Sequence, residues 1–218
     1  MGALAPRSAH NLEEFGVLSS KFFVPEEIGA SIAAYRPRPT DVIISPFAKC
    51  GTTWLQQIFH TLRTRGDMDF DDISRVVPWI ETSTMLGLDL EAAQKAEPRG
   101  FKSHLPYDAI PPGAKGIVSL RDPKDALVSF YHFTSGWFLE PGAVPLDEFA
   151  DFWITNGVGG LYWDHLLSWW KVRHDPKVLM LSYEQMIANP EDSIRRVAAF
   201  CDIPLEDDLL ALTLERSS

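Results

Sequence analysis

The chain has 218 residues, of which 45% are hydrophobic, and its formal net charge is -10 at pH 7. This size and apolar content suffice for one sizeable core, so we expect a single domain over residues 1–218, beginning with a loosely packed lead-in over residues 1–38. An acidic surface disfavours nucleic acid and anionic membranes as partners, because both require a broad basic face.

Cysteine usage and hydropathy point to a cytoplasmic protein. Cys50 and Cys201 are far apart in the chain, so they form neither a disulfide framework nor a metal-ligand motif, and a reducing compartment is the simplest interpretation. No run approaches the roughly 18 apolar residues of a membrane span. Residues 1–20 have no cationic flank followed by an apolar stretch, so we expect no secretory signal.

Three short apolar runs predict strands, over residues 41–45, 116–120 and 177–181. Runs without polar alternation suit strands that are covered on both faces, as in a parallel sheet. Between the second and third runs, apolar residues recur at helical spacing over 146–154 and 163–170. Strands that alternate with helices predict a three-layer α/β fold, in which helices cover both faces of a central, mainly parallel sheet.

Capping residues mark where further helices begin. Asp122 and Asn189 are each followed by proline. Asp or Asn can cap free N–H groups, and Pro fits the first helical turn. Another helix is expected after the first strand, beginning near Gly51. The glycine-rich residues 157–160 predict a flexible turn that is too short to link two domains.

The segment between the first strand and its helix has the features of a phosphate site. Free amide groups at a helix N-terminus carry partial positive charge and bind anionic oxygens. Gly51 lets the backbone approach an anion closely, Lys49 supplies a full charge, and Thr52 and Thr53 supply hydroxyl donors. The lysine precedes the only glycine, so this P-loop-like segment differs from the G-x-x-x-x-G-K-[ST] loop of NTPases. An ordinary capped helix with a surface lysine is the alternative interpretation.

Four segments, in chain order, resemble motifs of the cytosolic sulfotransferases, which use 3′-phosphoadenosine-5′-phosphosulfate (PAPS) as donor. Residues 49–54 resemble the donor-binding loop of that family, and residues 102–106 resemble the segment with its catalytic histidine. Residues 121–133 are similar to the family's 3′-phosphate segment, and residues 182–186 to the strand that places an adenine-contacting tyrosine. The resemblance covers the chain from the first predicted strand onward, and the chain looks like a bacterial-type member.

The chain departs from the family pattern in two places. Ala48 stands where the family loop usually has proline. Family members also continue past a segment like the one from Glu215 to Ser218 into a region with an Arg-Lys-Gly loop that grips the 3′-phosphate. The resemblance therefore implies that this chain lacks the C-terminal donor-binding part of the family domain.

The resemblance implies a catalytic role for three residues. His104 is expected to take the proton of the acceptor hydroxyl, Lys49 to stabilise charge on the leaving phosphate oxygen, and Lys102 to assist. Donor binding is expected from Lys49, Cys50, Gly51, Thr52, Thr53, Trp54, Arg121, Ser129, Tyr183 and Ser217. Because a sulfuryl group carries less charge than a phosphoryl group, we expect no metal to be required.

Within the donor set, the resemblance implies separate roles for the two ends of the nucleotide. Arg121 and Ser129 are expected to bind the 3′-phosphate, since the planar fork of arginine can make two parallel bonds to phosphate oxygens. Trp54 and Tyr183 are expected to flank the adenine. A structural arginine that caps the next helix, and aromatic side chains that belong to the core, are the alternatives.

For the acceptor, the resemblance implies an apolar site lined by Trp79 and Phe133 beside His104, with contributions from Trp137 and Phe138. Such a wall favours a small hydrophobic or aromatic hydroxyl compound. Plain packing in an aromatic-rich chain is an equal alternative. The sequence identifies neither the acceptor nor the oligomeric state.

Cys50 suggests a side hypothesis. A thiol at a helix N-terminus beside Lys49 is expected to have a lowered pKa and to be open to oxidation.

Two other functions stay open at this point. The first is a nucleotide-binding protein without transfer activity, which the shortened C-terminus would explain. The second is a kinase related to the P-loop enzymes, which the position of Lys49 before the glycine disfavours.

Overall fold

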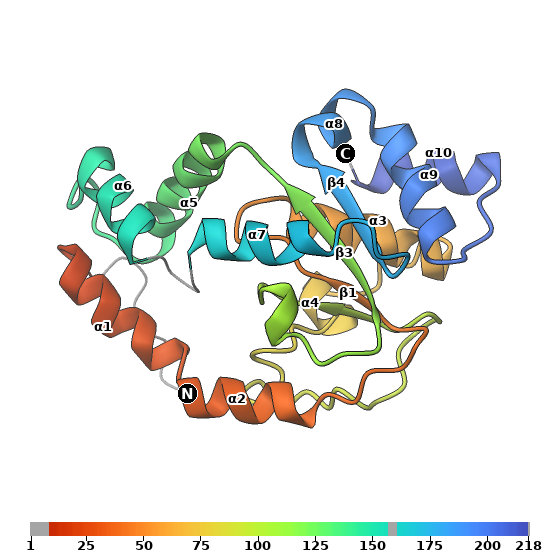
Figure 1. The fold of residues 1–218 in the computed structure, drawn as a ribbon, viewed down its shortest axis with the longest axis horizontal. Helices are drawn as coiled ribbons and strands as arrows, with labels where there is room; N and C mark the ends of the chain where they lie inside the picture. The colour runs from red at the N-terminus through yellow and green to blue at the C-terminus, as the bar shows by residue number, and fades with distance from the viewer. Residues whose placement is uncertain (1–8, 157–160, 218) are drawn as a thin grey trace.

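The computed structural model describes residues 9–156 and 161–217. Its centre is a four-stranded sheet in the order β2–β1–β3–β4, in which all neighbouring strands are parallel (Figure 1). The strands are β1 (Val42–Ile44), β2 (Gly100–Lys102), β3 (Lys115–Leu120) and β4 (Val178–Ser182). The parallel sheet that the three apolar runs predict is confirmed, and the expected turn at residues 157–160 lies outside the described residues.

Helices flank the sheet, connect its strands and pack beside it (Figure 1). They are α1 (Leu12–Phe22), α2 (Pro25–Ala34), α3 (Thr52–Thr64), α4 (Ile73–Val76), α5 (Pro123–Trp137), α6 (Leu146–Thr155), α7 (Tyr162–Lys171), α8 (Tyr183–Ala188), α9 (Pro190–Phe200), α10 (Asp207–Ser217) and a 3-10 turn, η1 (Tyr107–Ala109). The helices expected over 146–154 and 163–170 are confirmed as α6 and α7.

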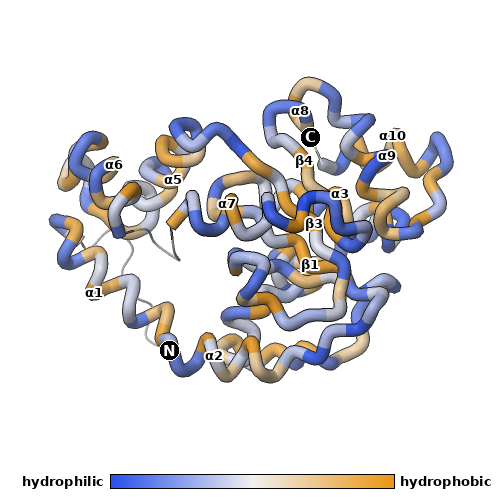
Figure 2. The backbone as a smooth tube through the Cα atoms, viewed as in Figure 1, coloured by the Kyte–Doolittle hydropathy of each residue, from blue (hydrophilic) through white to orange (hydrophobic). Residues whose placement is uncertain are grey.

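Successive strand residues point to opposite sides of the sheet, and the apolar residues on both sides are buried. Ile44 and Ile117 pack with residues of α3, α9 and α10, whereas Ile43 faces a second cluster that includes Tyr35 and Phe101. Figure 2 shows the resulting hydrophobic band along the strands. Removing an Ile side chain from water contributes roughly 1.5–3 kcal/mol. This two-sided burial confirms the three-layer α/β fold.

The expected helix starts are confirmed. The carboxylate of Asp122 accepts a hydrogen bond from the Lys124 amide at 2.8 Å, and the Asn189 side chain accepts one from the Asp192 amide at 3.2 Å. In both cases a proline occupies the first turn, where its missing N–H costs no helical hydrogen bond.

The lead-in that the sequence predicts over residues 1–38 contains two helices in the part that the structure describes. Asn11 caps α1 by accepting the Glu14 amide at 2.8 Å, and Pro25 begins α2. Tyr35, which follows α2, is buried against the sheet. Asparagine at the cap and glutamates in the first turn favour the helix α1.

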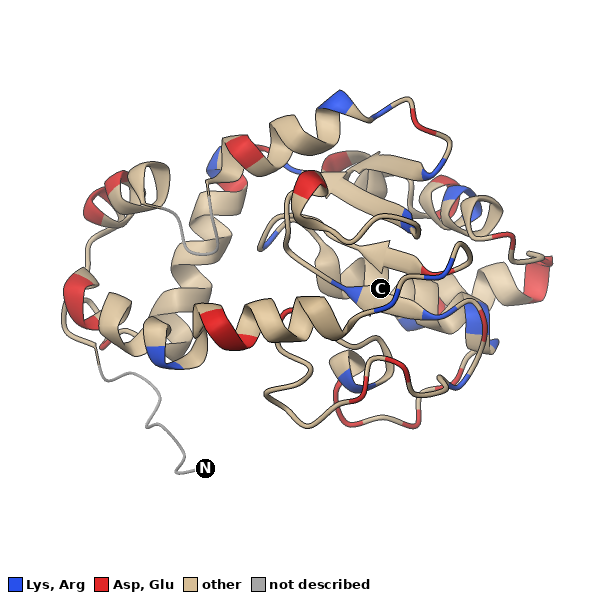
Figure 3. Cartoon of the chain, turned by 60° about the horizontal axis from the view of Figure 1, so that its bottom comes forward, with Lys and Arg blue, Asp and Glu red and all other residues tan. Residues whose placement is uncertain are grey.

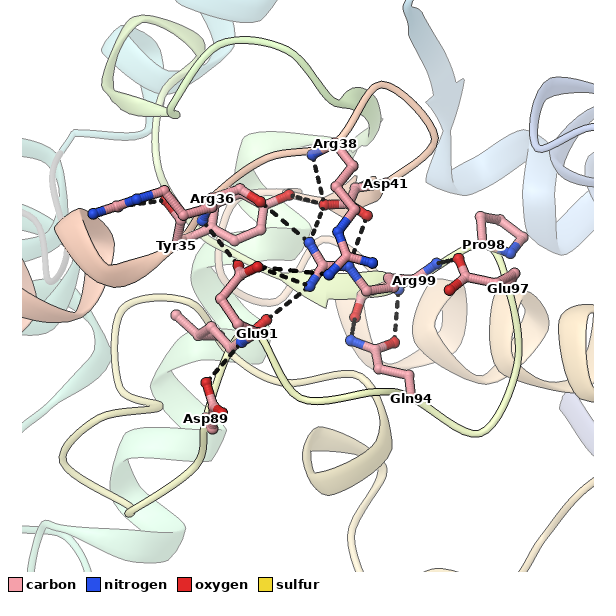
Figure 4. Close-up of polar contacts among 12 residues, drawn as sticks. Tyr35, Arg36, Arg38, Asp41, Asp89, Glu91, Gln94, Glu97, Pro98 and Arg99 are labelled. Carbon is pink, nitrogen blue, oxygen red and sulfur yellow. Dashed lines mark hydrogen bonds and ion pairs between the residues drawn. The ribbon is translucent and has the colours of Figure 1, made fainter.

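A buried ion pair joins the amino ends of β1 and β2. Arg99 donates from Nε to Asp41 Oδ1 at 2.9 Å and from Nη2 to Asp41 Oδ2 at 2.7 Å, and both side chains are 0% exposed (Figure 4). The Tyr35 hydroxyl donates to the same carboxylate at 3.0 Å. A buried charge pair needs this degree of hydrogen bonding to offset its loss of hydration.

Charged residues lie mostly on the surface helices and loops, while the strands are largely free of them along their length (Figure 3). Within residues 9–156 and 161–217, no helix is both long and apolar enough to cross a membrane.

Candidate active site

The candidate residues gather where the parallel strands end. Lys49 follows β1, His104 follows β2, Arg121 follows β3 and Tyr183 follows β4. The carboxyl ends of parallel strands meet at one edge of the sheet, and open α/β sheets bind their ligands there. The fold therefore brings together side chains from four segments that are distant in the sequence.

The loop from β1 to α3 is held in a tight, left-handed conformation. Lys49 has φ 67° and Gly51, the N-cap of α3, has φ 97°. The Arg121 guanidinium donates from Nη1 to the Lys49 carbonyl at 2.8 Å, and the Ser119 hydroxyl donates to the Cys50 carbonyl. Glycine is required at position 51 for two reasons: its φ is positive, and a Cβ there would lie 2.9 Å from the Tyr183 ring.

Three buried donors around this loop lack a hydrogen-bond partner among the described residues: Thr52 Oγ1, Trp54 Nε1 and Arg121 Nε. Buried polar groups are normally paired, so unpaired ones need an explanation such as a ligand. Together with the free amides at the start of α3 they form a donor-rich cradle. The residues present therefore fit an anionic phosphate or sulfate group. Thr53, by contrast, is exposed.

The two aromatic residues expected at the adenine are in mutual contact. The rings of Trp54 and Tyr183 pack edge to face at 6.0 Å between centroids, and the Arg121 guanidinium lies 4.3 Å from the Tyr183 ring centroid. Ser129 is half-buried on α5. Ser217 lies in the last turn of α10, a helix that packs on α3, and its hydroxyl donates to Thr213 of the same helix at 2.6 Å.

His104 has a defined hydrogen-bonding role. Its Nδ1–H donates to the Pro46 carbonyl at 2.8 Å, so the neutral ring leaves Nε2 unprotonated. Its backbone N–H donates to the buried carboxylate of Glu81 at 2.7 Å. Burial, followed by the charge of Lys102, lowers the pKa of His104 to about 3. The imidazole is thus neutral and able to accept a proton.

Two lysines flank this imidazole, each lying over an aromatic ring. Lys49 Nζ is 4.6 Å from the Phe133 ring centroid, and Lys102 Nζ is 4.1 Å from the Trp79 ring centroid. Burial lowers the pKa of both lysines, and both contribute to the low pKa of His104. The structure therefore brings the three expected catalytic residues within electrostatic reach of one another.

An apolar pocket of about 670 Å³ adjoins Trp79. It lies between the end of α1, α2 and the segment after Trp79, and is lined by Lys21, Phe22, Phe23, Glu27, Ala30, Trp79, Thr82, Thr84, Met85 and Leu86. The Trp79 indole also packs edge to face on the His104 ring at 5.3 Å, so this residue joins the pocket to the imidazole.

The other expected acceptor residues lie on the α5 side. Phe133 is 38% exposed and Trp137 is 60% exposed. Phe138 packs against Phe15 and Phe22 of α1, with ring centroids at 5.8 Å and 6.2 Å. Among these, Phe133 reaches the site through its contact with Lys49.

Sequence reasoning missed Glu81 and His165. Glu81 binds the backbone of His104, and His165, on α7, donates from Nε2 to the Ser45 carbonyl at 3.0 Å. A single acidic residue or histidine outside a motif gives no signal of its own. Both roles arise from tertiary contacts.

The hypothesis of a reactive Cys50 thiol is wrong in its premise. The side chain is 1% exposed, and burial raises the pKa of Cys50 to about 12. The helix terminus and nearby Arg121 favour the thiolate, but the loss of hydration outweighs them.

No group of three or more His, Cys, Asp or Glu side chains that could hold a metal ion is found in the described part of the chain.

The chain is similar to one described domain family and to individual proteins of several organisms. Residues 39–218 match the family described as "Sulfotransferase domain". Sulfotransferase 1B1 of Canis lupus familiaris is 32% identical over 201 residues, which cover 86% of this chain and 68% of that protein. Cytosolic sulfotransferase 5 of Arabidopsis thaliana is 32% identical over 191 residues, covering 78% of this chain and 59% of that protein.

Solved structures share the fold. Mouse sulfotransferase SULT7A1, complexed with PAP, superimposes with a TM-score of 0.70 at 23% identity, covering 91% of this chain and 71% of its own. An Arabidopsis thaliana putative steroid sulphotransferase has a TM-score of 0.72 at 21% identity, covering 89% and 73% respectively.

Proposed function

Because the chain belongs to the sulfotransferase domain family and is a PAPS-dependent sulfotransferase, we propose that it transfers a sulfuryl group to the hydroxyl of a small hydrophobic or aromatic acceptor. One observation carries the mechanism: Lys49 and Lys102 flank the neutral imidazole of His104, whose Nε2 has no proton, beside a loop with unpaired buried donors. That arrangement suits in-line transfer, which needs a proton acceptor next to a cradle for an anion.

The donor would occupy the loop after β1. PAPS, when bound, supplies an activated sulfuryl group whose leaving group is a nucleotide phosphate. The α3 amides, Thr52 Oγ1 and Lys49 would bind the 5′-phosphosulfate, and Lys49 would stabilise charge on the leaving oxygen. Cys50, Gly51 and Thr53 would contribute through their backbone groups in the same turn.

The remaining donor contacts would come from the ends of β3 and β4. Arg121 keeps Nε unpaired while Nη1 holds the loop, so it can bind the 3′-phosphate and position Lys49 together. Ser129 would assist from α5. Trp54 and Tyr183 would contact the adenine, and Ser217 would approach the adenosine. The PAP in the mouse structure supports a nucleotide of this kind.

His104 would act as the base. Its Nδ1–H is engaged by the Pro46 carbonyl, so Nε2 is the atom that accepts the hydroxyl proton. The low pKa of His104 in the free protein reflects burial and two nearby cations. An anion between Lys49 and Lys102 would offset those charges and raise the pKa of His104, which makes the imidazole a stronger base when the donor is in place. No metal is required by this scheme.

The acceptor would enter beside Trp79. The pocket of about 670 Å³ is large enough for a small ring compound, and its lining is mainly apolar. Phe133, under Lys49, would form the opposite wall. We further propose a cytoplasmic location, which the name of the Arabidopsis relative, cytosolic sulfotransferase 5, supports.

The test is incubation with ³⁵S-labelled PAPS and a panel of phenols, steroid alcohols, aliphatic alcohols and sugars, with and without EDTA. Labelled sulfate esters of the hydrophobic hydroxyl compounds, formed equally well in EDTA, support the proposal. PAP binding by calorimetry without transfer to any acceptor would instead favour a nucleotide-binding protein without activity. Transfer of phosphate from ATP that depends on Mg²⁺ would favour a kinase.

A further inference from the structure

Two histidines hold consecutive carbonyl groups at the start of the donor loop. His104 donates from Nδ1 to the Pro46 carbonyl at 2.8 Å, and His165 donates from Nε2 to the Ser45 carbonyl at 3.0 Å. Ser45 and Pro46 share one peptide bond, directly after β1. His165 therefore holds the peptide that immediately precedes the Pro46 carbonyl, on which the His104 tautomer depends.

The same face of α7 also binds the segment that carries His104. Trp169, one turn beyond His165, donates from Nε1 to the Leu105 carbonyl at 3.3 Å, and the Ser45 hydroxyl donates to that oxygen at 2.9 Å. Helix residues four apart lie on one face. A single rigid element thus contacts both the stem of the donor loop and the residue after His104.

His165 is well placed for this role because its side chain is buried and packed between aromatic rings. Its side chain is 4% exposed, and its ring packs edge to face on Phe47 at 5.6 Å and against Trp169 at 6.3 Å. Burial lowers the pKa of His165 to about 4, so near neutral pH the ring is uncharged and carries one N–H. The Ser45 carbonyl receives that N–H. Phe47, two residues beyond Ser45, is anchored in turn by Trp153 and Tyr162.

We propose that His165 is a positioning residue, which holds the Ser45–Pro46 peptide so that His104 keeps the tautomer that leaves Nε2 without a proton. The inference rests on the proposed function, since His165 acts through the proposed base. Without the His165 bond the Ser45–Pro46 peptide loses one of its restraints, although the Ser45 amide still donates to the Ile117 carbonyl. The Pro46 carbonyl, in the next peptide, is then held less strictly toward Nδ1 of His104. The His104 proton then has no fixed acceptor, and the other tautomer, with Nε2 protonated, becomes populated.

The direct test reads the tautomer by ¹⁵N NMR of the imidazole rings, with the His104 signals assigned from their loss in His104→Gln. His165→Phe keeps the ring packing and removes the donor, whereas His165→Gln keeps an N–H near the Nε2 position. Val197→Ala is the control for simple destabilisation. It opens a cavity beside α9 and removes no contact with the Ser45 or Pro46 carbonyl. Should His165→Phe not fold, His165→Asn, whose amide is too short to reach, replaces it.

We expect Nδ1–H of His104 in the wild type, His165→Gln and Val197→Ala, and a mixture with Nε2–H in His165→Phe. The kcat of His165→Phe is expected to fall by about tenfold, with KM for PAPS changed less, because misplacing a reacting group costs rate more than binding. An unchanged His104 tautomer in His165→Phe, or the same shift in Val197→Ala, would overturn the proposal. Because the tautomer is read without turnover, these results stand apart from any failure to find sulfuryl transfer.

Discussion

The guanidinium of Arg121 donates a hydrogen bond to the backbone carbonyl of Lys49 across 2.8 Å. This bond ties the residue after β3 to the loop after β1 and holds Lys49 in a left-handed conformation, with φ 67°. Arg121 therefore acts in two ways in our scheme, as a ligand for the nucleotide and as a support for the lysine that faces the leaving group.

Replacing Arg121 by Lys should weaken PAP binding by about tenfold or more, because lysine cannot hold the Lys49 carbonyl and a phosphate with one planar fork. Isothermal calorimetry with PAP measures the effect. Arg173→Lys is a matched control, since Arg173 also stacks on an aromatic ring, that of Trp170, at 4.5 Å. Equal affinities for wild type and Arg121→Lys would argue against the assignment.

Gly51→Ala should impair nucleotide binding and lower stability together. The added Cβ would meet the Tyr183 ring at 2.9 Å, and alanine would have to adopt φ 97°. Strain of this kind costs on the order of 1–3 kcal/mol. Urea unfolding and PAP calorimetry give the two effects. Gly29→Ala, where a Cβ would meet no atom within 4 Å, should leave PAP affinity unchanged. A Gly51→Ala protein as stable as wild type would contradict the geometry of the loop.

Breaking the Asp41–Arg99 pair should destabilise the fold without changing the site. Arg99→Met leaves the Asp41 carboxylate buried and unpaired, which costs about 3–5 kcal/mol. Urea unfolding measures this loss, and turnover well below the unfolding midpoint should be retained. Arg195→Ala, which breaks an exposed pair with Glu191, should cost less than about 1 kcal/mol. A loss no larger for Arg99→Met than for Arg195→Ala would be incompatible with the buried pair.

The titration of His104 tests its environment. With a pKa of about 3, the ring of the nucleotide-free protein should show no protonation as pH falls from 8 to about 5. Adding PAP brings negative charge beside the lysines, so the midpoint should move to higher pH. Imidazole NMR signals, assigned with His104→Gln, follow both changes. A midpoint near 6.5 in the free protein would show that the ring is neither desolvated nor close to Lys102.

The sheet could be predicted from the sequence where strands are apolar along their length. β1, β4 and the middle of β3 have apolar runs, whereas β2 has a single apolar side chain, Phe101, between Gly100 and Lys102. Its extended conformation comes from pairing with β1, a contact that local sequence does not record. Before β1, the side chain of Asn11 caps α1, a local signal that is visible in the sequence.

At the site, the residues that follow strands could be predicted because a parallel sheet gathers its carboxyl ends. The supporting residues could not. His165 reaches Ser45 from 120 residues along the chain, and nothing in its local sequence distinguishes it. The reactivity of Cys50 could not be predicted for a similar reason. The sequence shows a helix terminus and a neighbouring cation, but it does not show the burial that raises the pKa of the thiol.

The most direct measurement of the central claim is transfer of ³⁵S from PAPS to an accepted hydroxyl compound by wild type and His104→Gln, alongside PAP calorimetry of both. Our account predicts that His104→Gln loses transfer by about a hundredfold or more, as for removal of a general base, while its PAP affinity stays within about threefold. Transfer by His104→Gln at nearly the wild-type rate would contradict it.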